Sequence, residues 1–311
     1  MRILVLGANG QVGFELARAL APIGDVVVAT RDGVSPDATH CITADLARAD
    51  SLASALDEAR ADVIVNAAAY TAVDRAEDEP EFADRVNHLA VGEIGTWAAR
   101  YRASVVHYST DYVFDGSAKR PYREDDATAP LGVYGRTKLA GEEALRASGA
   151  SHLILRTAWV YTARGHNFLR TMLRLGAERD ELKVVDDQIG APTPARLIAE
   201  TTASLLPQWQ THVATGDTRF DGIYHLVAAG QCSWYAFAEA ILRGAAERGL
   251  IPKLPRIEPI ATADYPTRAR RPAWSVLDCD RLEGAFGLQL PPWEQGLAGV
   301  LDEMASPRSV N

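Results

Sequence analysis

Residues 3–13, Ile3-Leu4-Val5-Leu6-Gly7-Ala8-Asn9-Gly10-Gln11-Val12-Gly13, decide the fold. The stretch opens with a continuous apolar run, which is typical of a strand buried on both faces of a parallel sheet. A glycine-patterned turn follows, and residues 14–20 favour a helix. This order indicates a dinucleotide site, because the glycines let the backbone approach a pyrophosphate that the amides at the helix start can bind. We therefore predict that Gly7, Gly10 and Gly13 bind a dinucleotide cofactor.

Strand and helix continue to alternate up to about residue 160. Apolar runs predict strands at 25–30, 62–69, 104–108 and 152–157, with a short third strand near 44–46. Apolar residues at helical spacing predict helices at 81–100 and 134–147, and core packing alone explains the first of them. The pattern predicts an α/β fold with a doubly wound parallel (Rossmann) sheet, whose ligands lie at the carboxyl edge of the strands.

The pattern changes after residue 160. Helices are expected at 167–178, 196–206 and 234–248, a short strand at 182–185 and an apolar run at 224–227. We predict a NAD(P)-binding domain over residues 1–160, to which later segments can return. A smaller α/β substrate-binding domain is expected over residues 161–304, followed by a frayed tail at 305–311.

The segment 252–272 carries five prolines and is expected to be a rigid loop region. It also contains Arg256, Arg268, Arg270 and Arg271 in an otherwise acidic chain. Clustered arginines are what a phosphorylated substrate would need. The alternative, a solvated basic loop, stays open.

Several strand ends carry candidate cofactor contacts. NAD-selective folds place an acidic residue at the end of the second strand, where it binds the adenosine ribose. Here that strand ends in Thr30-Arg31, and Asp32 comes slightly late to serve as the ribose acceptor. Because an arginine at this place can pair with a 2'-phosphate, the sequence favours NADPH over NADH. The alternative is that Arg31 is a solvated loop charge. Asp45 and Leu46 are expected beside the adenine, and the small residues before Tyr70 and Thr71 leave room for the cofactor.

Tyr134 and Lys138 stand four residues apart in the expected helix 134–147. Positions i and i+4 share a helix face, so the phenol and the amine can point into one pocket, where a nearby cation would favour the phenolate. A chance spacing is the alternative interpretation. Ser109 and Thr110 end the preceding strand in hydroxyls, whereas Glu142 and Glu143 are expected to face outward.

Composition excludes several classes of function. A net charge of -9 argues against a nucleic-acid or membrane-surface protein. The three cysteines, Cys41, Cys232 and Cys279, form neither a disulfide framework nor a zinc motif and are expected to be buried thiols. Without a signal peptide or an apolar run long enough for a membrane span, the protein is expected in the cytoplasm.

The sequence thus combines a hydroxyl at a strand end, a Tyr, a Lys and a dinucleotide turn. This combination resembles the active-site set of the short-chain dehydrogenase/reductase superfamily, in its extended branch. Longer blocks closely resemble the dTDP-4-dehydrorhamnose reductase family, over residues 1 to about 304. They are His107-Tyr108-Ser109-Thr110-Asp111-Tyr112-Val113-Phe114, residues 130–142, Arg156-Thr157-Ala158-Trp159-Val160-Tyr161, Asn167-Phe168, Asp187-Gln188-Ile189-Gly190-Ala191-Pro192-Thr193 and residues 265–272.

The resemblance implies reduction of the 4-keto group of dTDP-4-dehydro-beta-L-rhamnose by a nicotinamide hydride, the last step of dTDP-L-rhamnose synthesis. It implies that Tyr134 donates the proton, that Lys138 holds the nicotinamide ribose and lowers the phenol pKa, and that Thr110 hydrogen-bonds the keto oxygen. Asp111 and Trp159 match sugar contacts. The cofactor positions that match are Gly10, Gln11, Val12, Asp45, Leu46, Ala69, Tyr70, Thr71 and Tyr108.

Some relatives dimerise through a magnesium ion held by glutamates. Glu15 and Glu303 match that pattern, but Arg196 stands where a third glutamate is expected. A cation beside Mg²⁺ is unfavourable, which argues against a metal-bridged dimer, and no metal ligands are predicted. A homodimer of another kind stays open.

Two other functions stay open at this point. A non-catalytic, dinucleotide-binding regulatory subunit of the methionine adenosyltransferase type would bind the cofactor without turnover. A reductase or epimerase of another nucleotide sugar, such as a 6-deoxy-talose type, would differ in the stereochemistry of its product at C4.

Overall fold

The computed structural model describes residues 1–35 and 40–306. Within these residues the largest sheet has seven strands, and all of its neighbouring strands are parallel. From edge to edge they are β11 (Gly222–His225), β6 (His152–Thr157), β5 (Ser104–Thr110), β4 (Val63–Asn66), β1 (Arg2–Leu6), β2 (Asp25–Thr30) and β3 (Cys41–Thr43). The predicted doubly wound α/β fold is confirmed.

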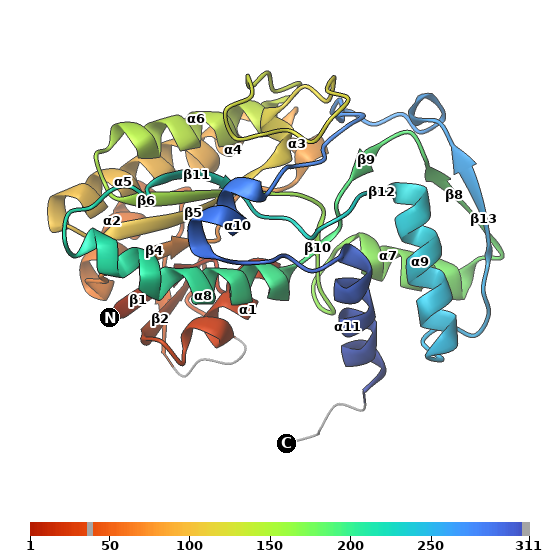
Figure 1. The fold of residues 1–311 in the computed structure, drawn as a ribbon, viewed down its shortest axis with the longest axis horizontal. Coiled ribbons are helices and arrows are strands. Elements are labelled where there is room, and N and C mark those ends of the chain that lie inside the picture. The colour runs from red at the N-terminus through yellow and green to blue at the C-terminus, as the bar shows by residue number, and fades with distance from the viewer. Residues whose placement is uncertain (36–39, 307–311) are drawn as a thin grey trace.

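Helices cover both faces of this sheet (Figure 1). Successive strand residues point to opposite faces, so Ile3 and Val5 belong to one core and Leu4 and Leu6 to the other. The first core includes α1 (Gln11–Leu20), α8 (Ala195–Val213) and α10 (Asp280–Phe286). The second includes α2 (Ala49–Ala59), α5 (Ala90–Tyr101) and α6 (Val133–Ala147).

A smaller lobe lies beside the sheet, with α7 (Phe168–Glu178), α9 (Trp234–Glu247) and α11 (Trp293–Ala305) around its own core (Figure 1). Its longest strand pair joins β8 (Glu181–Val185) to β13 (Arg256–Ile260) in parallel. Two short pairs complete it: β7 (Val160–Tyr161) with β10 (Thr193–Pro194), and β9 (Ile189–Gly190) with β12 (Cys232–Ser233).

Segments from the second half of the chain return to the large sheet. β11 pairs with β6, and Ile198, Leu205 and Trp209 of α8 lie in the same core as Ile3. The domain boundary at residue 160 remains a prediction. Of the expected frayed tail, residues 307–311 lie outside the described residues.

Some elements differ from the sequence expectations. The helix expected at 81–100 is divided into α4 (Pro80–Asp84), the π-helical turn η1 (Arg85–Leu89) and α5. The third strand ends at Thr43, before Asp45, and the segment 252–272 contains β13 and the 3-10 turn η3 (Thr262–Asp264). Proline is tolerated in β13 because β13 pairs only with β8 and is therefore an edge strand.

Two further expectations concern the burial of the cysteines and the presence of membrane-spanning helices. Cys41, Cys232 and Cys279 are free, but each is only partly buried, so the expectation of buried thiols was too strong. Among the helices of the described chain, none combines the length and apolar character that crossing a membrane requires.

Candidate active site

The carboxyl end of β5 meets the start of α6. Thr110 is the last residue of β5, and the 3-10 turn η2 (Asp111–Val113) follows it directly. The Thr110 hydroxyl donates to Asp111 Oδ1 at 2.9 Å and accepts the Tyr112 N–H at 3.2 Å. Tyr134 lies in the first turn of α6, and its ring contacts the Tyr112 ring edge-on at a centroid distance of 5.5 Å. The structure therefore brings Thr110, Asp111 and Tyr134 together.

The phenol of Tyr134 is held in its protonated form. Burial raises its pKa, the nearby Thr110 hydroxyl lowers it, and the negative charge of Asp111 raises it again, with a net upward direction. Lys138 is not among the groups that shift this pKa, and the lowering of the phenol pKa by Lys138 stays a prediction.

Lys138 is 1% exposed, and its amine donates to the Tyr108 carbonyl at 2.6 Å. Its Nζ also lies 3.3 Å from Nε2 of His107, a residue that the sequence reasoning missed. Burial lowers the pKa of Lys138 to about 8, although the Glu142 carboxylate acts in the opposite direction. The Tyr108 phenol points away toward α8, where it hydrogen-bonds Thr202, so only its backbone carbonyl contacts Lys138.

Asp111 has a carboxylate oxygen with no partner. Oδ1 accepts from Thr110, whereas Oδ2 is buried and makes no hydrogen bond within the described chain. Burial raises the pKa of Asp111 to about 6, against the opposing effect of the Thr110 hydrogen bond. A buried acceptor without a partner is costly, so this oxygen is available for a hydroxyl group of a ligand.

The glycine turn has the geometry of a pyrophosphate site. Gly7 has φ +78°, and a Cβ on it would lie 2.8 Å from the Ala68 backbone. A Cβ on Gly13 would lie 2.1 Å from the Gly7 carbonyl oxygen, so α1 packs directly on the turn. Gly10 caps α1 without any side-chain hydrogen bond, which leaves the amides of the first turn for an anion. These residues fit a dinucleotide.

The tip of β2 keeps its acidic residue occupied. The Thr30 hydroxyl donates to Asp32 Oδ1 at 3.0 Å, and the Val34 N–H donates to the same oxygen at 3.2 Å. Arg31 is exposed. Asp32 is thus tied into its own loop, while the Arg31 side chain is accessible to solvent.

Beyond β3, Asp45 and Leu46 lie in a loop and not in a strand. The Asp45 carboxylate accepts the Ala47 N–H at 3.0 Å, and the Asp45 N–H donates to the Ser51 hydroxyl at 3.0 Å. Leu46 is buried. Local hydrogen bonds therefore fix this loop at the end of the sheet.

Asn87 fixes the segment that contains Ala69, Tyr70 and Thr71. Its side chain accepts the Tyr70 N–H at 2.8 Å and donates to the Tyr70 carbonyl at 3.0 Å and to Thr137 at 3.2 Å. Asn87 lies in the π-helical turn η1, and such turns often occur at functional sites. Core packing alone thus does not explain this helix, and no signal in the sequence distinguishes Asn87.

Trp159 follows β6 with φ +49°, an unusual conformation for a bulky residue. Its ring stacks on that of Trp234 with a centroid distance of 3.5 Å and an interplanar angle of 6°. A Cβ on Gly190 would lie 2.5 Å from this ring, so only glycine fits there. The indole thus packs against Trp234 and Gly190, as a platform for a ligand would require.

Behind the site, Glu142 and Arg156 form a buried ion pair with exposures of 1% and 2%. Arg156 donates to both carboxylate oxygens, at 2.9 and 2.7 Å, and the Ser109 hydroxyl donates to Glu142 Oε1 at 2.5 Å. The expectation that Glu142 faces outward was wrong. Its helix face packs on β5 and β6, where Arg156 supplies the counter-charge.

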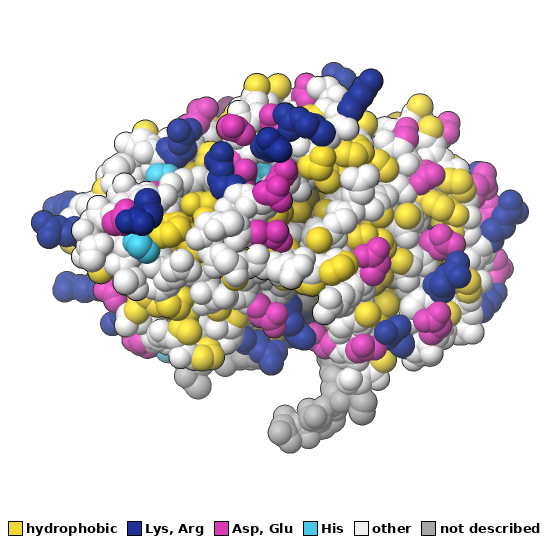
Figure 2. Space-filling view, in the orientation of Figure 1, with side chains coloured by type: hydrophobic (Ala, Val, Ile, Leu, Met, Phe, Trp, Pro, Cys, Tyr) yellow, Lys and Arg dark blue, Asp and Glu magenta, His cyan; other side chains and the backbone are white. Residues whose placement is uncertain are grey.

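The arginines of the proline-rich segment are partly neutralised within the chain. Arg268 pairs with Asp78, and Arg271 pairs with Asp74 at 3.0 Å. Burial raises the pKa of Tyr112 to about 12, and the positive charge of Arg271 opposes this shift. The Tyr112 ring in turn contacts Tyr134. Cationic and acidic side chains are mixed along the upper rim of the face in Figure 2, so the segment does not form a purely basic patch there.

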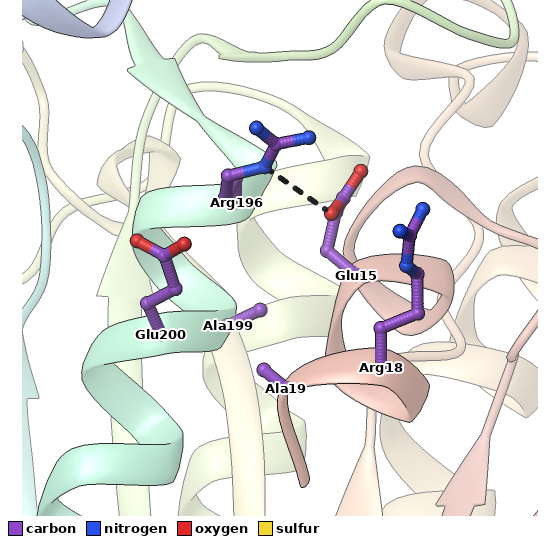
Figure 3. A pocket seen from close by; sticks show the side chains of 6 residues that line it. All are labelled: Glu15, Arg18, Ala19, Arg196, Ala199 and Glu200. Carbon is purple, nitrogen blue, oxygen red and sulfur yellow. Dashed lines mark ion pairs between the residues drawn. The ribbon is translucent and has the colours of Figure 1, made fainter. Parts of the chain in front are cut away.

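Glu15, Arg196 and Glu303, the residues that bear on a magnesium-bridged dimer, lie together. Arg196 Nε is 3.7 Å from a carboxylate oxygen of Glu15, and its Nη2 is 2.5 Å from one of Glu303. Figure 3 shows Arg196 reaching across from α8 to Glu15 on α1, beside a cavity of about 320 Å³. The guanidinium occupies the position between the carboxylates, and the described residues contain no cluster of ligands that could hold a metal ion.

Comparisons with known proteins identify the family to which the chain belongs. The family model of the RmlD substrate binding domain matches residues 1–306. A dTDP-4-dehydrorhamnose reductase of Burkholderia thailandensis is 48% identical over 308 residues, covering 98% of this chain and 100% of that protein. The protein of the same name from Escherichia coli (strain K12) is 46% identical over 310 residues, covering 100% of both.

Among solved structures, a dTDP-4-dehydrorhamnose reductase of Bacillus anthracis in complex with NADP superimposes with a TM-score of 0.83. It is 32% identical, and the match covers 97% of this chain and 98% of that one. The family resemblance predicted from the sequence is confirmed. The chain belongs to the RmlD substrate binding domain family.

Proposed function

We propose that this protein reduces the C4 keto group of dTDP-4-dehydro-beta-L-rhamnose to dTDP-L-rhamnose, the last step of dTDP-rhamnose biosynthesis, with a nicotinamide cofactor. The observation that carries the proposal is the joint position of Thr110, Asp111 and Tyr134 beside Lys138, where β5 ends and α6 begins. Full-length relatives named for this activity support it.

The proposed cofactor is NADPH, although NADH uses the same kind of site. Asp32 is already hydrogen-bonded by Thr30 and Val34, so a ribose hydroxyl would have to compete for it. Exposed Arg31 suits a 2'-phosphate, and a solved relative contains NADP. The residues proposed to hold the cofactor are Gly7, Gly10, Gln11, Val12, Gly13, Thr30, Arg31, Asp45, Leu46, Ala69, Tyr70, Thr71, Tyr108, Tyr134 and Lys138.

When bound by these residues, a reduced nicotinamide would supply the hydride to C4 of the sugar. Tyr134 then donates its proton to the C4 oxygen, and burial suits it to this role because a raised pKa keeps the phenol protonated at neutral pH. The Thr110 hydroxyl stabilises the developing negative charge by a hydrogen bond to the same oxygen. Lys138 holds the ribose hydroxyls.

The sugar is proposed to lie between Asp111 and Trp159. The free Oδ2 of Asp111 accepts a sugar hydroxyl, and the indole of Trp159, backed by Trp234, packs against the apolar face of the ring. The four proposed substrate contacts are Thr110, Asp111, Tyr134 and Trp159.

The test is consumption of NADPH, and separately of NADH, with enzymatically generated dTDP-4-dehydro-L-rhamnose, followed by identification of the sugar product. We expect dTDP-L-rhamnose, faster turnover with NADPH, and a loss of that preference in Arg31→Ala. Formation of the C4 epimer would contradict the stereochemistry, and tight NADPH binding without turnover would contradict catalysis.

A further inference from the structure

A buried chain of side chains connects two strands to the amine of Lys138. His107 of β5 is fully buried, and its Nδ1 lies 3.1 Å from the Asn66 Nδ2 of β4. On the other side of the ring, Nε2 lies 3.3 Å from the Lys138 Nζ. Asn66 and His107 are direct neighbours in the register of β4 and β5, so the sheet itself fixes this contact.

The orientation of the Asn66 amide decides which imidazole nitrogen carries the proton. The Ala68 N–H donates to Asn66 Oδ1 at 3.2 Å, which turns the Asn66 NH₂ group toward His107. A donor facing Nδ1 requires a lone pair on Nδ1. The imidazole is neutral because its complete burial lowers the pKa of His107 well below its usual value. The single ring proton must then lie on Nε2.

An Nε2–H that faces an amine needs a lone pair on the amine nitrogen. An ammonium group has three donors and no acceptor, whereas the uncharged amine has one lone pair. The Lys138 amine also donates to the Tyr108 carbonyl at 2.6 Å. In the uncharged form it can accept from His107, donate to Tyr108, and keep one N–H for a ribose hydroxyl.

We propose that His107 is a positioning residue for Lys138: Asn66 sets its tautomer, and its Nε2–H donates to the amine and favours the uncharged form. The link from this network to cofactor binding rests on the proposed function. The other ionisable groups near Lys138 are Glu142, which Arg156 and Ser109 already bind, and Tyr134 one turn earlier. From η1, the neutral Asn87 contacts α6 through Thr137.

The first test is the tautomer of His107 in the full chain without added cofactor. Long-range ¹H–¹⁵N correlation spectra at about pH 9, above the Lys138 pKa of about 8, distinguish the two neutral tautomers from the imidazolium, and loss of the signal in His107→Phe assigns it. We expect the Nε2–H tautomer. An Nδ1–H tautomer or an imidazolium would overturn the proposal, and because the wild-type chain is used, the result does not depend on how a variant folds.

The second test reverses the hydrogen bond with Asn66→Asp. A carboxylate beside Nδ1 requires a proton there, so Nε2 becomes an acceptor for the charged amine. NADPH affinity, measured by calorimetry from pH 6 to 10, should fall as Lys138 loses its charge. The midpoint of that fall should move upward by on the order of one pH unit in Asn66→Asp.

Asn87→Asp is the matched control, because it places the same carboxylate beside α6 without touching His107. We expect it to leave the tautomer unchanged and to move the midpoint less. Equal shifts in both variants, or a flipped tautomer without a shift in Asn66→Asp, would overturn the proposal. Neither readout needs the sugar substrate, so absence of reduction would refute the proposed function and leave this inference testable.

Discussion

Lys138 is a buried cation that the fold retains at a cost, and replacing it by Met should therefore stabilise the protein at neutral pH. Its side chain is 1% exposed, and burial lowers its pKa from 10.5 to about 8. Each pKa unit corresponds to about 1.4 kcal/mol, so keeping the buried amine charged costs about 3 kcal/mol. Met has nearly the same length, carries no charge and packs well in irregular spaces.

Loss of a hydrogen bond offsets part of this gain. Without the amine, the Tyr108 carbonyl loses its donor at 2.6 Å, which costs about 1–2 kcal/mol for a buried acceptor. The expected net gain for Lys138→Met at pH 7 is therefore about 1–2 kcal/mol. The same variant should lose most NADPH affinity and turnover.

The pH dependence of the free energy of unfolding provides an independent check that charging Lys138 destabilises the folded protein. The folded-state pKa of Lys138, about 8, lies below its unfolded value, so the folded wild type binds fewer protons than the unfolded chain between pH 8 and about 10.5. Wild-type stability should rise relative to the variant across this window. The advantage of Lys138→Met is thus greatest below pH 8, disappears between about pH 9 and 10, and reverses toward 10.5, where only the cost of the lost hydrogen bond remains.

The assay is urea unfolding followed by tryptophan fluorescence at several pH values from 7 to 10, with Lys183→Met as the control. Lys183 has a side-chain exposure of 61%, so its replacement should give a difference that is small and flat with pH. A Lys138→Met variant that is less stable than the wild type at pH 7, or whose stability difference does not change with pH, would refute the reasoning.

Three further outcomes are expected. Tyr134→Phe should lower turnover by about 10²- to 10⁴-fold while NADPH affinity stays nearly constant, because the hydroxyl acts mainly in the transition state; near-normal turnover would exclude the proton-donor role. For Asp111, whose pKa burial raises to about 6, the carboxylate form is lost as the pH falls through that value. Substrate kcat/KM should therefore fall below about pH 6, and a pH profile with the same acid limb in Asp111→Asn would contradict this assignment. Glu142→Gln should destabilise the protein by about 3–5 kcal/mol in urea unfolding, because it leaves the Arg156 charge buried and unpaired. Exposed Glu143→Gln should have little effect, and equal losses in the two variants would refute the buried-pair argument.

Local sequence pattern was sufficient to place the residues of the proposed active site. The apolar run before Gly7 predicted β1, and the i,i+4 spacing placed Tyr134 and Lys138 on one side of α6. Parallel strands end at one edge, so the hydroxyl of Thr110 was expected near them. These features depend on residues close together in the chain, or on a general rule of sheet topology.

Helix phase showed which residues share a face but not what packs against that face. Glu142 was expected in solvent, whereas the helix surface that carries it packs on Arg156 of β6. Likewise the arginines near residue 270 suggested a free cationic loop, but Arg268 and Arg271 meet Asp78 and Asp74. In both cases the counter-charge comes from another element, and periodicity carries no information about it.

The sequence by itself determined the parallel α/β fold, the glycine turn before α1 and the proposed set of Thr110, Tyr134 and Lys138, because periodicity and short motifs act over a few residues. Only the tertiary structure decided how these groups are tuned. His107 meets Asn66 across 41 positions and Arg271 meets Asp74 across 197, through strand register and loop packing. Burial among such distant partners, and not residue type alone, lowers the pKa of Lys138 and raises that of Tyr134.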